Sequence, residues 1–283
     1  MTHLQSVTIP DLGVPAERPQ IPGSTLAARC DAVYSKAGTT WVFVYADREH
    51  NANILHLTGF DPRFEEAVLL LGPGGKRIVI TGNESESFTA ISPLPGLEVM
   101  LSQTMSLMGQ DRTRAPRLES VLREAGLSAG DSVGVVGWKY LETEEWEDER
   151  PGFIVPHYMV VTLARIIGGH DGLRDVTAIL MHPNHGTRSI VDADQIAAFE
   201  WASTRASASI WNMVTKARPG QREIDAATNF LYAGEPLTAH SMFSSGDANT
   251  TIHGLNSAGS RVLNKGDGVT TAVGYWGGLS SRA

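Results

Sequence analysis

The residues best suited to chemistry lie in the last stretch of the chain, from Met242 to Ala283. A Ser245-Gly246 pair is followed, seven residues after the glycine, by a single histidine, His253. A Gly266-Asp267 turn then opens an apolar run. Imidazole suits general acid–base chemistry, because its unperturbed pKa lies near the pH at which most enzymes work. We therefore interpret this stretch as one half of an active site.

The composition argues against one large class of function. The chain has 283 residues, enough for one large domain or two ordinary ones. Its apolar share of 42% supports buried cores, and its charged share of 19% fits an ordinary soluble surface. The formal net charge is -8, and Lys and Arg form no cluster with interleaved aromatic residues. Such a chain is not expected to bind nucleic acid, because phosphate backbones require a basic surface.

The sequence also predicts a reduced compartment away from membranes. The single cysteine, Cys30, cannot form an intrachain disulfide or hold a metal alone, so we interpret it as a small buried apolar residue. The N-terminal residues lack the basic start and apolar core of a secretory signal. No apolar run approaches the length of a bilayer span. We therefore expect a cytoplasmic protein.

Strand-like and helix-like segments alternate between residues 24 and 180. Short apolar runs predict strands, and apolar residues three or four apart predict helices. The predicted strands are 41–45, 66–72, 76–80, 97–101, 132–138 and 176–180, and the predicted helices are 24–36, 48–60, 115–127 and 157–169. The acidic segment 142–150 is interpreted as a solvated surface loop. The alternation predicts the α/β class with an at least partly parallel sheet.

Three regions are expected along the chain. Residues 1–23 are Pro-rich and predict an extended N-terminal arm, 24–183 form the α/β domain, and 184–283 form a second domain. The boundary falls within 181–188, where Pro, Asn and Gly cluster. His182 and His185 in this linker are interpreted as polar loop residues, because no carboxylates accompany them at helical spacing.

Two helices and three strands are predicted beyond this boundary. Asp192 and Gln195 have the spacing of a capping box at the start of a long helix, which Pro219-Gly220 ends. Ser203 lies in its apolar stripe and is expected to let another element approach closely. The stripe itself comprises Ile196, Phe199, Ala206, Ile210, Met213 and Ala217. A second helix is predicted over 222–234, and strands near 240–245, 250–254 and 268–273.

The order of these motifs resembles the creatinase and Xaa-Pro aminopeptidase superfamily, the pita-bread hydrolases. Pro219-Gly220 with Glu223 matches the family's helix junction, Ser245-Gly246 with His253 matches its strand-and-histidine signature, and Gly266-Asp267 matches the entry to its first metal-bearing strand. LTGF at 57–60 matches a piece of its N-terminal domain. The resemblance implies a creatinase-type N-terminal α/β domain at 24–183. It also implies the first half of a pita-bread catalytic domain at 184–283.

The sequence departs from the metallopeptidases of that superfamily at the metal site. Where they carry the first aspartate ligand, this chain has Ala272. The second aspartate corresponds to Leu279, shortly before Arg282. Neither side chain offers an oxygen to a divalent cation. The resemblance therefore implies no metal ligand at either position, and no cofactor is predicted. The alternative is a divalent metal, Mn or Zn, whose ligands lie at positions other than the ones matched here.

Resemblance to creatinase, the metal-free member of the superfamily, implies a role for four residues. His253 takes the position of the general acid/base, and its alternative role is a hydrogen-bonded histidine between strands. Phe60, Arg63 and Phe64 are the candidates that the N-terminal domain of one subunit brings to the substrate of its partner in a homodimer. Arg63 is suited to clamp a carboxylate through two hydrogen bonds. The alternative role of Arg63 is a surface ion pair with Glu65 or Glu66. The alternative role of Phe60 and Phe64 is packing in the protein interior.

Three functions remain open at this stage. The first is a metal-independent hydrolase that cleaves a C–N bond in a small amidino, ureido or amide substrate, or in a short peptide. The second is a metal-dependent Xaa-Pro aminopeptidase or dipeptidase. The third is a non-catalytic pita-bread scaffold that binds peptide or protein. We also expect a chain that continues past Ala283, because half of this fold alone would expose an apolar helix face and an unpaired sheet edge.

Overall fold

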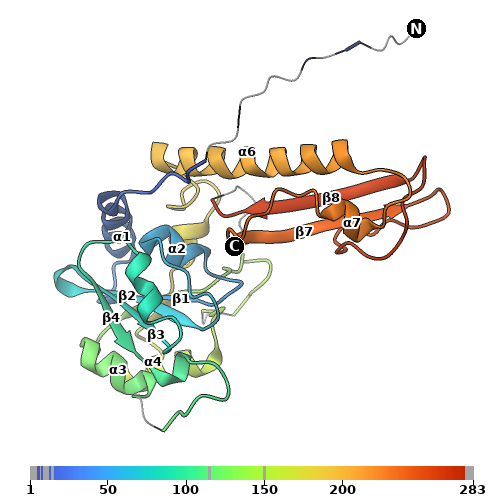
Figure 1. The fold of residues 1–283 in the computed structure, drawn as a ribbon. Coiled ribbons are helices and arrows are strands. Elements are labelled where there is room, and N and C mark those ends of the chain that lie inside the picture. Colours follow the sequence, from blue (N-terminus) through green and yellow to red (C-terminus); the bar gives the residue numbers. More distant parts are fainter. Residues whose placement is uncertain are drawn as a thin grey trace. The chain divides into compact units, whose positions relative to one another are not determined.

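A computed structural model describes residues 5, 6, 8, 13, 16–113, 116–148 and 151–277 (Figure 1). Leu279 and Arg282 lie outside these residues. The chain divides into two compact units between Asp192 and Ala193. We call the part from Ile21 to Asp192 the N-terminal unit, and the part that begins at Ala193 the C-terminal unit. The sequence places the corresponding boundary at 183–184.

A sheet with the strand order β4-β3-β2-β1-β5-β6 forms the centre of the N-terminal unit. Its strands are β1 (Trp41–Ala46), β2 (Ala67–Gly72), β3 (Lys76–Thr81), β4 (Leu97–Leu101), β5 (Val133–Val136) and β6 (Leu173–Asp175). β2 runs antiparallel to both of its neighbours, β1 and β3. The pairs β1–β5, β5–β6 and β3–β4 are parallel. The predicted α/β class with a partly parallel sheet is therefore confirmed.

Helices cover both faces of this sheet. One core contains the inner residues of α1 (Gly23–Ala37), α2 (Ala52–Thr58) and α5 (Ala178–Met181), packed on one side of the strands. A second core contains those of α3 (Leu118–Ala125) and α4 (His157–Ile167) on the other side. Val42 and Val44 point into the first core, and Phe43 and Tyr45 into the second. β1 is therefore buried along its whole length, which explains why its sequence is a continuous apolar run.

Glycines with positive φ end one helix and join two strands of this unit. Gly59 follows α2 in the left-handed region, with a φ of 72°, and its N–H donates to the carbonyl of Leu55. Gly74 and Gly75, which join β2 to β3, also have positive φ, at 72° and 79°. A side chain is strained in this region, so glycine sets these turns.

The C-terminal unit consists, in its described part, of two helices and one antiparallel hairpin. These are α6 (Ala193–Lys216), α7 (Glu223–Ala227), β7 (Leu237–Gly246) and β8 (Gly268–Tyr275). α6 runs along the hairpin (Figure 1). Met213 joins Phe243 and Phe230 in one core cluster, and Trp201 and Ala202 join Tyr275 in a second. The long helix and two of the strands therefore lie where the sequence predicts.

The apolar stripe of α6 agrees with the predicted one in part. Ile196, placed in the stripe from sequence, is 53% exposed, and Ser203 is exposed as well. The residue that meets a neighbouring element is Ser209, whose hydroxyl lies 2.7 Å from the hydroxyl of Tyr275. The buried positions are Ala198, Trp201, Ala202, Ser209 and Met213. The predicted stripe therefore overlaps the buried face, with Ala206, Ile210, Met213 and Ala217 packed in the two cores, and it omits the small buried residues.

Three predicted segments are wrong. Residues 176–180 are not a strand: β6 ends at Asp175, whose carboxylate accepts hydrogen bonds from the N–H and hydroxyl of Thr177, and α5 follows. The predicted helix over 222–234 is only the short α7, which ends at Ala227. Residues 250–254 form a loop instead of a strand. Local side-chain hydrogen bonds compete with strand formation, and this competition explains the first error.

No helix in the described part of the chain is long and apolar enough to cross a membrane.

Candidate active site

The candidate general acid/base, His253, lies in the loop that connects β7 to β8. The ends of the two strands pair closely, with Ser245 opposite Val269 and Gly246 opposite Gly268. The carbonyl of His253 accepts a hydrogen bond of 3.2 Å from the N–H of Asn256, which closes a tight turn. The carbonyl of Asn256 accepts one of 3.0 Å from the N–H of Phe243, so the loop returns to β7. The side chain of His253 is exposed.

A contact between Ile252 and two glycines fixes the start of this turn. A Cβ added at Gly246 would stand 2.8 Å from Cγ1 of Ile252, and one added at Gly268 would stand 3.0 Å from its Cδ1. Gly246 and Gly268 are cross-strand partners, so together they leave space for one isoleucine side chain. The residue after that isoleucine is His253. The glycines of the two sequence motifs therefore position the loop that carries the histidine.

On the expectation that His253 transfers a proton, Gly246→Ala should lower activity by at least about tenfold, because the new methyl group displaces Ile252 and with it the loop of His253. The matched control is Gly254→Ala, whose Cβ would lie 3.8 Å from the hydroxyl of Thr270, an ordinary contact distance. Steady-state kinetics of both variants checks this. Equal activity in the two would contradict a positioning role for the glycine pair.

Glu223 connects α7 to the hairpin and to the loop. Its Oε1 accepts hydrogen bonds from the N–H of Ser245 at 2.7 Å and from its hydroxyl at 2.6 Å. Its Oε2 accepts one of 3.0 Å from the N–H of Gly259. Burial raises the pKa of this carboxyl, but the three hydrogen bonds outweigh burial and hold the pKa below its usual value. The carboxylate thus acts as a buried clamp between three segments of the C-terminal unit.

Arg261 extends this clamp to the Gly-Asp turn. Its Nη1 donates to the hydroxyl of Ser245 at 2.8 Å and to Oδ2 of Asp267 at 2.6 Å. The N–H of Asn264 donates to the same Oδ2 at 2.7 Å. These hydrogen bonds, first those from Arg261, lower the pKa of Asp267. Glu223, Ser245 and Asp267, which match the family signature, are therefore linked through one arginine that sequence reasoning missed.

Ala272, which the resemblance sets at the first ligand position, lies on β8. Val273 and Tyr275 of β8 pack toward α6, so Ala272 lies on the opposite face of the hairpin. Ala272 is exposed and pairs with Met242. Thr270 shares its face, and Gly254, the neighbour of His253, lies against the hydroxyl of Thr270. The turn of His253 and the residue in the ligand position thus share one side of the hairpin.

The donor set on this side does not fit a divalent metal. The methyl group of Ala272 has no lone pair to offer a cation. Among the described residues, no group of three or more His, Cys, Asp or Glu side chains is arranged to hold a metal ion. We therefore derive no chemical step through a metal.

Phe60, Arg63 and Phe64 all belong to the N-terminal unit. Phe60 is fully buried and packs near Phe88, at 6.1 Å between ring centroids, so it has no surface to offer a ligand. Arg63 lies 3.0 Å from Asp61 through its Nε and covers the ring of Phe88 at 4.7 Å. Its ion-pair partner is therefore Asp61. Phe64 is 66% exposed. Of the three, Arg63 and Phe64 are accessible, and Phe60 is a core residue.

Glu65 and Glu66 explain why Arg63 pairs elsewhere. The carboxylate of Glu65 is buried and accepts hydrogen bonds from the N–H groups of Glu84 and Ser85. The carboxylate of Glu66 accepts hydrogen bonds from the hydroxyls of Tyr45 and Tyr158. Both acids are therefore engaged by neighbours that lie far from them in sequence.

Sequence reasoning also missed a serine–histidine pair. The hydroxyl of Ser257 lies 3.2 Å from Nε2 of His240, and both residues are exposed. This distance suits a nucleophile and its base. A triad also needs a group that orients the second ring nitrogen, and no described residue makes a hydrogen bond to Nδ1 of His240. His253 therefore stays the better candidate for proton transfer.

The fold and site together define a class: an α/β unit followed by a unit in which a long helix supports a hairpin with an exposed histidine loop. Solved structures with a similar fold include an X-Pro aminopeptidase from Thermotoga maritima (TM-score 0.61, 14% identity, 88% of this chain and 60% of that chain covered). Also similar are a prolidase from Pyrococcus horikoshii OT3 (TM-score 0.60, 14%, 88% and 60%) and an Xaa-Pro dipeptidase from Bacillus anthracis (TM-score 0.56, 14%, 90% and 61%). This chain thus shares the fold of these Xaa-Pro peptidase structures over the part of their length that it covers.

The chain spans about 60% of the length of these structures. No family profile and no curated protein matches the sequence.

Proposed function

We propose that this chain is part of a hydrolase that cleaves a C–N bond in a small substrate or short peptide, without a metal ion and with His253 as general acid/base. The observation that carries the proposal is the exposed imidazole in a turn held by Ile252 and the glycine pair, on the side of the hairpin that carries Ala272. The resemblance sets this alanine where the metallopeptidases have a carboxylate. The shared fold supports a reaction at a C–N bond, because the similar structures bear the names of peptidases that act next to proline.

The chemistry assigned to His253 is proton transfer. A neutral imidazole takes a proton from the attacking water, and the resulting imidazolium returns it to the leaving nitrogen. Arg63 of the N-terminal unit is proposed to hold a substrate carboxylate, with Phe64 beside it. We further propose that these two residues act on the partner's substrate in a homodimer, and that the protein works in the cytoplasm.

A chelator distinguishes this function from its main alternative. We expect the rate to stay within about twofold after dialysis against EDTA, because no proposed step uses a metal. The substrates to assay are small amidino, ureido and amide compounds and one Xaa-Pro dipeptide. Loss of activity on EDTA treatment, restored by Mn²⁺ or Zn²⁺, would support the alternative function, a metal-dependent Xaa-Pro peptidase.

A further inference from the structure

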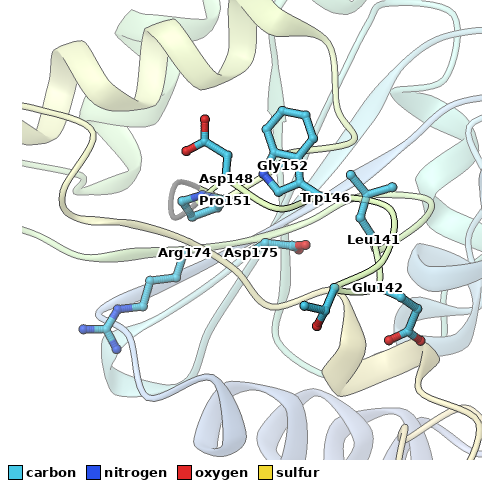
Figure 2. Close-up of a pocket in the computed structure, with 9 residues that line it drawn as sticks. Leu141, Glu142, Trp146, Asp148, Pro151, Gly152, Arg174 and Asp175 are labelled. Carbon is cyan, nitrogen blue, oxygen red and sulfur yellow. The ribbon is translucent and has the colours of Figure 1, made fainter.

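A cavity of about 340 Å³ opens on the N-terminal unit beside the last residue of β6, Asp175 (Figure 2). Leu141 and the indole of Trp146 line it and pack against Gly152, where an added Cβ would stand 2.9 Å from Cδ1 of Leu141. Residues 149–150, in the same loop, lie outside the described part of the chain. We therefore assign no ligand to this cavity.

A chemically reactive side chain is exposed elsewhere in this unit, on the loop between β4 and α3. Met108 is 87% exposed, whereas Met105, three residues earlier in the same loop, is 2% exposed. The other methionines that the structure describes are buried or half-buried. Gly109 follows Met108 with a φ of 90°, so the chain turns directly after it. The loop thus presents one thioether to solvent.

Hydrogen bonds on both sides of Met108 hold this loop to the segment that follows β3. The hydroxyl of Ser106 donates to Oδ1 of Asn83 at 2.7 Å and accepts from the Asn83 N–H at 3.2 Å. The side-chain amide of Gln110 donates to Oε1 of Glu84 at 3.1 Å. The exposure of Met108 therefore belongs to a loop that is anchored at both of its sides.

Arg112 covers one side of the Met108 sulfur. Its Nη2 donates to Sδ of Met108 at 3.5 Å and to the carbonyl of Ser106 at 2.8 Å. A thioether sulfur is a weak acceptor with two lone pairs, and this contact engages one of them. The other lone pair is open to a small reagent, because so little of the residue is covered.

The chemistry of an exposed thioether is oxygen transfer from a peroxide. A sulfur lone pair attacks one oxygen of hydrogen peroxide and the O–O bond breaks. That oxygen becomes bound to sulfur, and the other oxygen leaves as water with both protons. Sulfur is oxidised by two electrons and the peroxide is reduced by two. The product, methionine sulfoxide, is chiral at sulfur, and each of two classes of reductase converts one epimer back to methionine.

We propose that Met108 is a site of reversible oxidation by hydrogen peroxide, and that Arg112 directs the oxygen to the lone pair it leaves open, so that one sulfoxide epimer prevails. The modification converts a flexible apolar side chain into a polar one at an accessible position. This site is independent of the hydrolase function proposed for His253, because Met108 and Arg112 belong to the N-terminal unit and take no part in that chemistry.

A time course with hydrogen peroxide tests the selectivity. The folded chain is treated, digested and analysed by mass spectrometry, with fragmentation to distinguish the two methionines of the loop. We expect Met108 to gain one oxygen at least about tenfold faster than the buried Met105. Met108→Leu should remove this fast reaction without changing the slow ones. Equal rates at Met105 and Met108 would reject the proposal.

The two reductase classes report the stereochemistry at sulfur. We expect one class to reduce at least about threefold more of the Met108 sulfoxide than the other. Arg112→Gln removes the donor to Sδ and should bring the ratio close to one. The matched control, Arg123→Gln, removes an exposed arginine of α3 that pairs with Glu119, and it should keep the ratio. A ratio near one in the unsubstituted chain, or an unchanged ratio in Arg112→Gln, would overturn the proposal.

Discussion

Replacing His253 by asparagine is expected to lower kcat by about 10²–10⁴-fold while KM changes little. Asparagine is close to histidine in size and can keep a polar contact, but it cannot take up and release a proton near neutral pH. The exposed imidazole makes no hydrogen bond that the turn needs, because only the backbone carbonyl of His253 closes that turn. The variant should therefore fold as the wild type does. Its kinetics on the best substrate of the panel, together with its thermal unfolding, provide the measurement.

The matched control is His240→Asn, on the same hairpin. His240 is also exposed, and its ring contacts Ser257 instead of the His253 turn. We expect kcat to stay within about twofold in this variant, because the proposed proton transfer does not use His240. A large loss in His240→Asn with normal rates in His253→Asn would reject the role assigned to His253 and would favour the serine–histidine pair.

The α/β unit could be predicted from sequence because its signals are local. The run from Trp41 to Tyr45 is apolar at every position because both faces of β1 are covered. A short, continuous apolar run of this kind is typical of a strand buried on both faces. Gly59 and Gly126 end α2 and α3 because both adopt positive φ, a conformation that glycine tolerates best. Where one residue type determines the backbone conformation, as at these glycines, the sequence alone is enough to predict where a helix ends.

The errors arise where a distant partner decides the structure. The buried face of α6 also includes Ala198, Ala202 and Ser209, which the predicted stripe omits, because a hairpin lies close to these small residues. The strand predicted at 176–180 has β-branched residues, but the side chain of Asp175 ends the strand first. Phe60 and Phe64 lie in the same short segment of sequence, but only the fold shows that Phe60 is buried and Phe64 is exposed.

The candidate site also combines residues that the sequence motifs reveal with contacts that only the structure reveals. The motif resemblance assigned Glu223, Ser245 and Asp267 to family signatures, but it did not say what these residues do. Their hydrogen bonds to one another and to Arg261 show a frame that holds the loop of His253. A motif can therefore consist mainly of supporting residues, and the histidine is the one member with an exposed titratable side chain.

Replacing Glu223 by alanine is expected to destabilise the protein by on the order of 2–4 kcal/mol, because the N–H of Ser245, its hydroxyl and the N–H of Gly259 all lose their buried acceptor. Glu223→Gln should cost less, since its amide oxygen still accepts hydrogen bonds while its NH₂ group faces donors. Urea unfolding at neutral pH gives the free energies. The control, Asp225→Asn, removes an exposed carboxylate two residues away whose pair with Arg222 is a surface ion pair, and it should leave stability unchanged.

The same carboxylate predicts a pH dependence. The folded-state pKa of Glu223 lies below that of an unfolded chain, so its stabilising effect is fully present above the unfolded value of about 4.3. It is lost as the pH falls from there through the folded-state pKa, because the clamp must then be protonated. Wild-type stability should therefore drop more steeply below about pH 4 than the stability of Glu223→Gln, which has no proton to gain. Parallel pH profiles for the two proteins would show that Glu223 does not serve as the ionised clamp of the His253 loop.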